Sequence, residues 1–307
     1  MRRLLAAVAV LSLAASAGAA DQARSVRVTV LPEIGAPPIA AGDLAATLDG
    51  RPARVTASRG PADDLMMLLV LDLTEDLGVV ELAKEAMLRA VDQLPGNVYV
   101  GVMRAQDGLN VLVDPTPDRA AVKKAITELP VSGHAGLLDT IETTSRLADS
   151  ILDRAGIRVA LVYITDSSIY NYREDYINPV VNASDHSDMS RRFPEGLVRE
   201  KISKLDAKLA AFQAPLFLVH LSYRSDRMSE AYQTGLMQLA ATAGGTSAFC
   251  RSRAEVPEAI SATLNKAAAH YSLVVTIPDH PAKIVQVQLD TGGRQLSYRS
   301  RFVINKE

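Results

Sequence analysis

The fold is decided by the stretch Leu65-Met66-Met67-Leu68-Leu69-Val70-Leu71-Asp72, a continuous apolar run that ends in an acid. A run of this length is typical of a central parallel strand that is buried on both faces. Arg158 to Thr165 is a second such run, and Asp166 follows it. Segments with apolar residues at helical spacing alternate with these and other strand-like segments. The alternation predicts an α/β fold with a doubly wound, mostly parallel sheet and right-handed crossovers.

The neighbouring segments complete this sheet. We expect at most one antiparallel hairpin, placed at an edge of the sheet, where the turn Gln106-Asp107-Gly108 separates two strands. The predicted strands are 65–71, 98–104, 109–113, 158–165, 215–222 and 246–249, and the predicted helices are 79–94, 118–129, 136–154, 196–212, 228–243 and 256–271.

Both ends of the chain show β patterns without helices. Strand-like segments lie at 25–31, 44–48, 53–58, 272–277, 283–289 and 295–304. Asp49-Gly50, between two of them, predicts a hairpin turn. We therefore predict one small β-sandwich-like unit made by both ends of the chain. In this interpretation residues 21–63 are an N-terminal β segment, residues 64–271 are an inserted α/β domain, and residues 272–307 are a C-terminal β segment that packs against 21–63.

The composition narrows the classes of partner. The 307 residues carry a formal net charge of −2 at pH 7, and only 5% of them are aromatic, with no Trp. Nothing in this balance favours binding to nucleic acid or to an anionic membrane surface. The single cysteine, Cys250, excludes an internal disulfide framework and any multi-cysteine metal site. We expect it to be a small buried apolar residue.

The N-terminus predicts export. Residues 1–20 contain Arg2-Arg3, an apolar run from Leu4 to Leu13, and the small residues Ala17-Gly18-Ala19. These are the three parts of a secretory signal peptide. No later segment approaches the length of a membrane span without charges. We therefore expect an exported protein, periplasmic or secreted, that does not span the membrane after signal cleavage.

Polar residues collect where the predicted strands end. Asp72 and Asp166 end two central strands, and the loop 132–139 opens a helix at the same edge. In a doubly wound sheet, ligands bind at the carboxyl ends of the strands. Carboxylate and hydroxyl oxygens are the ligands that hard divalent cations prefer. This edge is therefore the candidate site.

Four segments in this order resemble the von Willebrand factor type A (VWFA) family. The family's Asp-x-Ser-x-Ser corresponds to Asp72-Leu73-Thr74-Glu75-Asp76, and its Gly-Gly-Thr loop corresponds to Gly133-His134-Ala135. The family's Thr-Asp-Gly corresponds to Thr165-Asp166-Ser167, and its late Leu-Ala-x-x-Thr-Gly-Gly corresponds to 239–245. The resemblance implies a Rossmann-like fold and protein binding or adhesion through the C-terminal edge of the sheet.

The resemblance also implies a metal-ion-dependent adhesion site (MIDAS) with departures. Asp72, Thr74 and Asp166 are retained, but Asp76 stands where a hydroxyl is expected and Ala135 replaces the family's Thr. Two outcomes stay open for this degenerate site. Asp72, Thr74, Asp76 and Asp166 bind one divalent cation, Ca²⁺, Mn²⁺ or Mg²⁺, or the site is metal-free. Without metal, three crowded carboxylates favour protonation of one of them or recruitment of a Lys or Arg.

A closer resemblance is to exported bacterial VWFA-related proteins of the type often labelled Acidobacterial. It rests on the turn Leu48-Asp49-Gly50-Arg51-Pro52 and on the strand His270-Tyr271-Ser272-Leu273-Val274 after the last helix. This resemblance extends over nearly the full length of the chain, and it implies no defined function.

The long segment Ser168 to Pro194 directly follows Asp166, so we expect it to lie over the candidate site and to contact a partner. The predicted partner-binding residues are His134, Ser167, Tyr170, Tyr172, Asp185 and His186.

Three function classes follow. The first is an exported protein-binding module. The alternative is a metal-free structural subunit of an envelope assembly. A hydrolase is the least favoured, because no set of nucleophile, base and orienting residue is visible, and we predict no catalytic residues. The sequence does not identify the protein partner.

Overall fold

The computed structural model describes residues 24–33, 38–39, 44–74, 76–172, 194–278, 281–290 and 292–304. The predicted signal peptide lies outside these residues. Among the described helices, none is long and apolar enough to cross a membrane.

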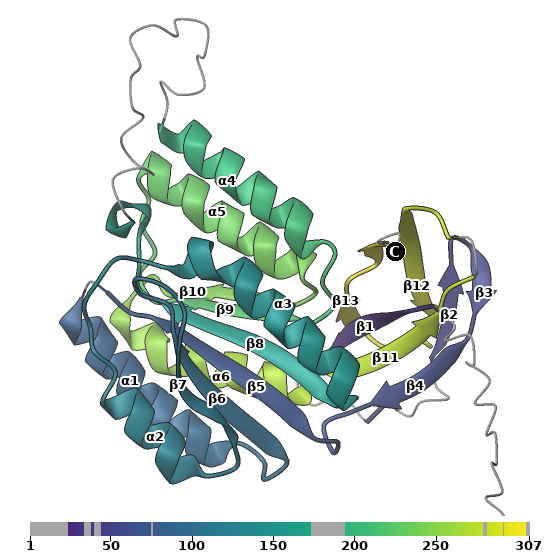
Figure 1. The fold of residues 1–307 in the computed structure, drawn as a ribbon, viewed down its shortest axis with the longest axis horizontal. Coiled ribbons are helices and arrows are strands. Elements are labelled where there is room, and N and C mark those ends of the chain that lie inside the picture. Colours follow the sequence, from purple (N-terminus) through teal and green to yellow (C-terminus); the bar gives the residue numbers. More distant parts are fainter. Residues whose placement is uncertain are drawn as a thin grey trace, which may run out of the picture.

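The main sheet has six strands in the order β10-β9-β8-β5-β6-β7 (Figure 1). β5 pairs in parallel with β6 on one side and with β8 on the other, and β7 is antiparallel to β6 at the edge. The predicted doubly wound, mostly parallel sheet is therefore confirmed, with its hairpin at one edge. The strands are β5 (Leu65–Asp72), β6 (Val98–Arg104), β7 (Asn110–Thr116), β8 (Arg158–Thr165), β9 (Leu216–His220) and β10 (Ser247–Phe249).

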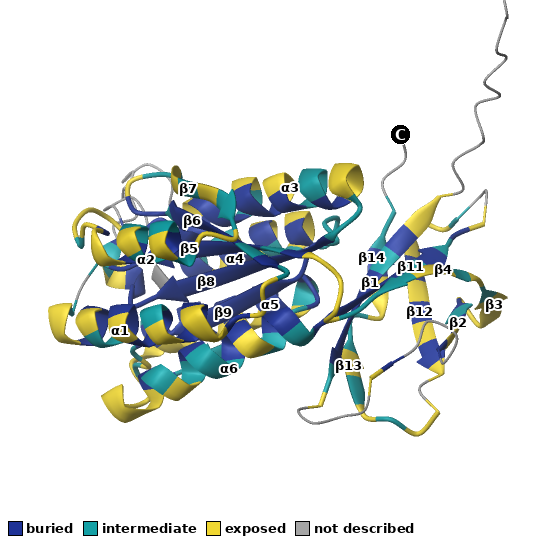
Figure 2. Ribbon diagram, turned by 90° about the horizontal axis from the view of Figure 1, so that it is seen from below, coloured by how far each residue is buried: buried dark blue, intermediate teal, exposed yellow. Residues whose placement is uncertain are grey.

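Helices cover both faces of this sheet (Figures 1 and 2). Alternate residues of β5 point to opposite faces of the sheet. Leu65, Met67 and Leu69 pack in the core with α1, α2 and α6. Leu68 and Val70 pack in the core with α3, α4 and α5. β5 is thus buried on both sides, as its unbroken apolar run predicts. The helices are α1 (Leu77–Gln93), α2 (Arg119–Thr127), α3 (Leu137–Ala155), α4 (Pro194–Leu209), α5 (Arg227–Thr242) and α6 (Val256–Ala269), with short 3₁₀ turns η2 (Ile169–Asn171) and η5 (Arg253–Glu255).

The two ends of the chain form a second, all-β unit. Two four-stranded sheets, β13-β1-β11-β4 and β14-β12-β2-β3, share one apolar core. β1 pairs antiparallel with β11 from Ser25 to Val30, so N-terminal and C-terminal segments lie side by side, as predicted. The strands are β1 (Ser25–Pro32), β2 (Ala45–Leu48), β3 (Arg51–Ala53), β4 (Val55–Arg59), β11 (Tyr271–Thr276), β12 (Ile284–Asp290), β13 (Leu296–Tyr298) and β14 (Arg301–Val303).

Two predicted strands differ in detail. The Asp49-Gly50 turn, with φ of 50° and 78°, does make a hairpin, but its second strand is the short β3. The following β4 belongs to the other sheet, where it pairs with β11. Similarly, the predicted strand 295–304 is divided into β13 and β14, one in each sheet. Strands that switch sheets at a corner are typical of closely packed β-sandwiches, and pattern alone does not reveal the switch.

The β-unit lies beyond the amino ends of β5 and β8, away from the candidate site at their carboxyl ends (Figure 1). The side chain of Arg299 helps to hold it there. Its guanidinium donates from Nη1 to the carbonyl oxygen of Phe212 at 2.7 Å and from Nη2 to that of Ala210, just after α4.

Candidate functional site

Asp72 is fully buried at the carboxyl end of β5. Its Oδ1 accepts a hydrogen bond from Gly136 N at 3.0 Å, and its Oδ2 accepts one from Leu137 N at 3.2 Å. Burial raises the pKa of Asp72 to about 6, although these donors partly offset the effect. The backbone at position 136 packs directly against the carbonyl group of Ala105. This position requires glycine, because a Cβ there would lie 1.7 Å from that carbonyl oxygen. Asp72 therefore anchors the start of α3.

Asp166 is buried at the end of the neighbouring β8 and holds the loop between β5 and α1. Its Oδ1 accepts a hydrogen bond from Thr74 N at 2.7 Å, and its Oδ2 accepts one from Asp76 N at 3.1 Å. Thr74 Oγ1 lies 3.1 Å from Ser167 Oγ. The loops that carry Asp72, Thr74 and Asp166 therefore lie together at one edge of the sheet.

Asp76 points to a different set of partners. Its Oδ1 caps α1 by accepting from Gly78 N at 2.9 Å and Val79 N at 3.3 Å. Arg253 donates to both carboxylate oxygens, at 3.2 Å to Oδ1 and 2.9 Å to Oδ2. The Arg253 guanidinium, followed by the helix N–H groups, keeps the pKa of Asp76 below its usual value. The ion pair joins the first turn of α1 to the η5 loop.

These contacts are a poor fit to a MIDAS metal. Asp76 is already neutralised by Arg253, and Ala135 is buried without an oxygen to offer. The carboxylate oxygens of Asp72 and Asp166 already accept hydrogen bonds from main-chain N–H groups. Within the described residues, no three His, Cys, Asp or Glu side chains are placed to hold a metal ion together. The side chain of Asp76 contacts Arg253 and the α1 N–H groups, although its main-chain N–H donates to the carboxylate of Asp166.

Two predicted partner-binding residues are internal. Ser167 is buried, and its Oγ donates to the carbonyl oxygen of Asp72 at 3.2 Å. Tyr172 is also buried, and its hydroxyl accepts from Leu138 N and lies 3.1 Å from the hydroxyl of Tyr232. Their polar groups hold loops in place, so neither side chain faces a partner in this structure.

The other predicted partner-binding residues divide into two groups. His134 and Tyr170 are exposed; His134 Nδ1 lies 3.0 Å from Asp107 Oδ1, and Tyr170 donates its hydroxyl to Asp226 Oδ1 at 3.0 Å. The two loops adjoin, because Ala135 N donates to the carbonyl oxygen of Asn171. Asp185 and His186 lie outside the described residues.

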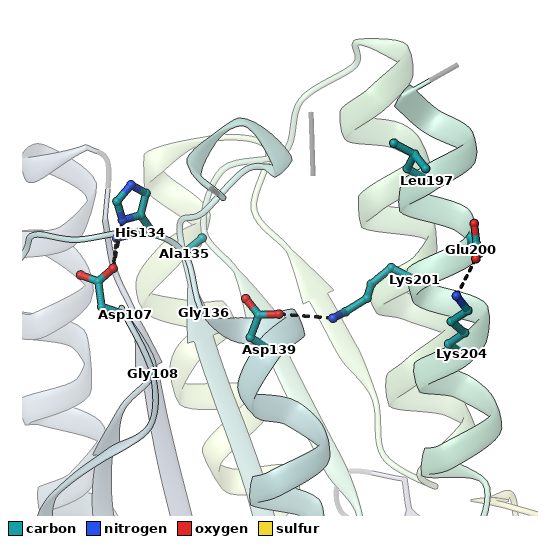
Figure 3. A pocket seen from close by; sticks show the side chains of 10 residues that line it. All are labelled: Asp107, Gly108, His134, Ala135, Gly136, Asp139, Leu197, Glu200, Lys201 and Lys204. Atoms are coloured by element: carbon teal, nitrogen blue, oxygen red, sulfur yellow. Dashed lines mark hydrogen bonds and ion pairs between the residues drawn. The ribbon is translucent and has the colours of Figure 1, made fainter. Parts of the chain in front are cut away.

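A polar cavity of about 590 Å³ opens between the 134–136 loop and α4 (Figure 3). Its ionisable side chains contact one another. His134 pairs with Asp107, Lys201 with Asp139 at 3.3 Å, and Lys204 with Glu200 at 2.5 Å. Among the described residues that line it, no nucleophile is aligned with a base.

His220 is a buried residue of this edge that the sequence analysis did not single out. Its Nε2 lies 3.0 Å from the carbonyl oxygen of Ser167, and its Nδ1 accepts from Ser222 N at 3.3 Å. These partners require a neutral ring with the proton on Nε2. Burial lowers the pKa of His220 to about 4. The ring contacts the carbonyl of Ser167 and not its hydroxyl, so the pair is not a nucleophile and base.

Arg253 was also missed, although the sequence carried a partial signal. A metal-free site was expected to recruit a Lys or Arg, and Arg253 fills that role for Asp76. The two residues are 177 positions apart, so spacing alone could not identify the arginine. His220 carried a clearer signal, because it lies near the carboxyl end of the predicted strand 215–222, at the same edge as Asp72 and Asp166.

Comparison with known families agrees with this arrangement. Residues 67–168, which run from β5 to just past β8, match the model of the von Willebrand factor type A domain. This part of the chain has the fold of a von Willebrand factor type A domain. The match includes Asp72, Thr74, Asp76, Ala135 and Asp166, the positions that the sequence analysis compared with a MIDAS. No curated protein matches the chain in sequence.

Solved structures resemble the VWFA domain at low identity. An aerotolerance-related membrane protein from Bacteroides fragilis is 15% identical, with 66% of this chain and 99% of that chain covered and a TM-score of 0.40. A von Willebrand factor type A protein from Catenulispora acidiphila is 15% identical, with 92% and 75% covered and a TM-score of 0.45. Proximal thread matrix protein 1 from the mussel byssus, with a zinc-occupied MIDAS motif, is 13% identical, with 71% and 48% covered and a TM-score of 0.44. At these values the likenesses support no functional inference.

Proposed function

We propose that this protein is an exported protein-binding module that contacts its partner through the carboxyl edge of the main sheet and needs no divalent cation to do so. VWFA domains generally mediate protein–protein interaction. The proposal that binding needs no metal rests on the ion pair between Arg253 and Asp76, at 2.9 Å. This ion pair supplies a fixed positive charge beside the altered MIDAS.

The surface around this ion pair suits a protein partner. Leu77, directly after Asp76, is 65% exposed, and Tyr170 and Tyr223 are exposed on the loops that follow β8 and β9. Exposed apolar and aromatic side chains among polar ones are the composition of a protein interface. The Lys201–Asp139 and Lys204–Glu200 ion pairs of the neighbouring cavity favour this interpretation over binding of a small charged substrate. Catalysis finds no support in the Ser167–His220 contact.

The test is capture of partners from an envelope extract under two metal conditions. Wild-type protein should retain the same proteins in EDTA and in millimolar Mn²⁺, and Leu77→Glu should release them. Met237→Glu is the matched control, because Met237 is a similarly exposed apolar residue on α5 outside the site. Loss of capture in EDTA contradicts metal independence.

The alternative, a structural subunit of an envelope assembly, shares the metal-free site. It differs in where the contact lies. An assembly contact elsewhere on the molecule should survive Leu77→Glu and be lost in variants away from the carboxyl edge. Export itself is tested by the N-terminus of the protein recovered from cells, which should begin at Ala20 or Asp21, together with its fractionation.

A further inference from the structure

The loops after β9 and β10 carry Tyr223 and two arginines, and an ion pair connects them to the start of α1. We call Leu77, Tyr223, Arg251 and Arg253 the arginine patch. Tyr223 N donates to the carbonyl oxygen of Cys250 at 2.8 Å, which holds the two loops together. The Arg253–Asp76 ion pair then joins the η5 loop to the first turn of α1, where Leu77 lies.

Arg251 is held ready to bind an anion. Its guanidinium carbon lies 5.5 Å from the centre of the Tyr223 ring, in a cation–π contact between exposed side chains. A stacked guanidinium keeps the N–H groups on its edge available for a bidentate partner. In the part of the chain that the structure describes, Arg251 forms no ion pair with a carboxylate. Glu255, its nearest acid in the loop, instead accepts from Arg251 N at 2.9 Å and from the Ser252 hydroxyl at 3.1 Å.

Arg253 extends the same positive surface. Its side chain is 65% exposed, even though Nη2 pairs with Asp76. It lies close against Gly78, where a Cβ would come within 3.2 Å of both terminal nitrogens. This close approach keeps the guanidinium at the first turn of α1, to which Leu77 belongs. The patch therefore combines two exposed arginines with an exposed Leu and an exposed Tyr.

We propose that the arginine patch binds an acidic segment of a protein partner, one that carries an Asp or Glu next to an apolar or aromatic side chain. The inference rests on the proposed function and specifies the chemistry of its partner. Charge-assisted, bidentate contacts between guanidinium and carboxylate are among the strongest hydrogen bonds in proteins. Arg and Tyr are also the residue types that dominate binding energy at protein interfaces.

A polyphosphate chain fits this surface less well. Asp76, Asp226 and Glu255 lie in the same three loops as the patch, and the whole chain carries a net charge of −2. A nucleic acid strand would bring many charges past these carboxylates, whereas one or two carboxylates on a peptide need contact only Arg251 and Arg253. This arrangement of two arginines among three carboxylates therefore favours a short acidic peptide segment over a polyphosphate chain.

The experiment is selection of peptides from a random dodecamer phage library on the full chain, with counter-selection on the Arg251→Met/Arg253→Met variant. The selected peptides should be enriched in Asp and Glu beside apolar residues. One selected peptide is then synthesised with a twin in which every Asp and Glu becomes Asn and Gln. By fluorescence anisotropy, the twin should bind at least tenfold more weakly to the wild type.

Three variants locate the binding. Arg251→Met should weaken the selected peptide by about tenfold, and Tyr223→Leu, which removes the ring under Arg251, by severalfold. Arg146→Met, an equally exposed arginine on α3, should leave the affinity within twofold. Circular dichroism and Tm establish that each variant is folded.

Several outcomes overturn the inference. The inference is wrong if the selected peptides show no acidic enrichment, or if the neutral twin binds within twofold of the original peptide. It is also wrong if Arg251→Met and Arg146→Met lose the same affinity for the peptide. Tighter binding of a single-stranded oligonucleotide dodecamer than of the peptide likewise overturns it. A partner captured through Leu77 whose binding is unchanged by Arg251→Met overturns the acidic-segment inference and leaves the proposed function in place. Failure of the edge-dependent capture itself overturns the proposed function.

Discussion

Nη2 of Arg158 lies 2.6 Å from the carbonyl oxygen of Asp63, in a contact that joins the first residue of β8 to the segment leading into β5. The same guanidinium donates to the carbonyl oxygens of Pro61, Ala268 and His270. Residues 61–63 enter the α/β unit and residues 268–270 leave it. One buried side chain therefore binds both connections between the VWFA domain and the β-unit. Burial lowers the pKa of Arg158 to about 10, so it remains charged at neutral pH.

Arg158→Met should destabilise the protein by about 3 kcal/mol, because the buried carbonyl groups of Ala268 and His270 lose this donor. Loss of the Arg158 hydrogen bonds should also make the two segments that link the units more accessible to proteases. Denaturant unfolding and limited proteolysis near residues 61–63 measure the two effects. Arg89→Met, which removes only an exposed helix pair with Glu85, is the control and should cost less than about 0.5 kcal/mol. Equal losses in the two variants contradict the assigned role.

The proposed metal-free site predicts no thermal stabilisation by metal ions. A bound ion at a hundredfold excess over its Kd adds about 2.7 kcal/mol of stability, which raises Tm by several degrees. Millimolar Mg²⁺, Ca²⁺ or Mn²⁺ should leave the Tm of the wild type at its value in EDTA. Asp76→Ser/Ala135→Thr restores the two hydroxyls expected of the family and frees the site from the Arg253 ion pair. This variant should gain stability from Mg²⁺ or Mn²⁺.

A rise in Tm for the wild type with any of the three ions contradicts the metal-free interpretation. Asp72→Ala in the double-variant background is the control, because it removes a central ligand and should abolish any gain.

Asp76 has two roles that substitutions can separate. Asp76→Ala loses both the α1 cap and the Arg253 ion pair and should cost about 1–2 kcal/mol. Asp76→Asn keeps a capping oxygen and loses only the ion pair, so it should cost less than about 1 kcal/mol. A double-mutant cycle of Asp76→Asn with Arg253→Met, measured by chemical unfolding, should give a coupling energy of about 0.5 kcal/mol. Equal costs for the Ala and Asn variants argue against the cap.

The sequence predicted the main sheet well, because its signal is local. The unbroken apolar run of β5 is the direct consequence of burial on both faces, with alternate residues in the two cores. The β-unit was harder to predict in detail. Whether residues 55–59 pair with 45–48 or with β11 depends on a change of sheet at residue 54, and both pairings fit the same alternating pattern.

The site could be predicted only in part, because many of its contacts join residues that are far apart in the sequence. Asp72 and Asp166 were found because each ends a predicted strand, and parallel strands bring their carboxyl ends together. What each carboxylate contacts depends on residues far away in sequence, such as Gly136 for Asp72 and Arg253 for Asp76. Burial of Tyr172 depends on its contact with Tyr232, 60 residues away, which no local pattern reveals.

Buried titratable groups predict how stability depends on pH. Burial lowers the pKa of His220 and of His270 to about 4, below the value of about 6.5 in an unfolded chain. The unfolded state thus binds two more protons than the native state between pH 4 and 6, and the stability from the neutral rings falls as the pH falls. Asp72 acts in the opposite direction, because its pKa is raised to about 6 and the native state holds its proton.

Together these three groups give the unfolded state one extra proton between pH 4 and 6. They should therefore make the free energy of unfolding rise by about 1.4 kcal/mol per pH unit in that range. His220→Gln keeps a donor for the carbonyl of Ser167 and an acceptor for Ser222 N but cannot titrate, so it should lower the slope by one proton, about 1.4 kcal/mol per unit. His220→Gln/His270→Gln should lower it by two. Denaturant unfolding at several pH values measures the slopes, and an unchanged slope in His220→Gln contradicts the assignment of a neutral, buried His220.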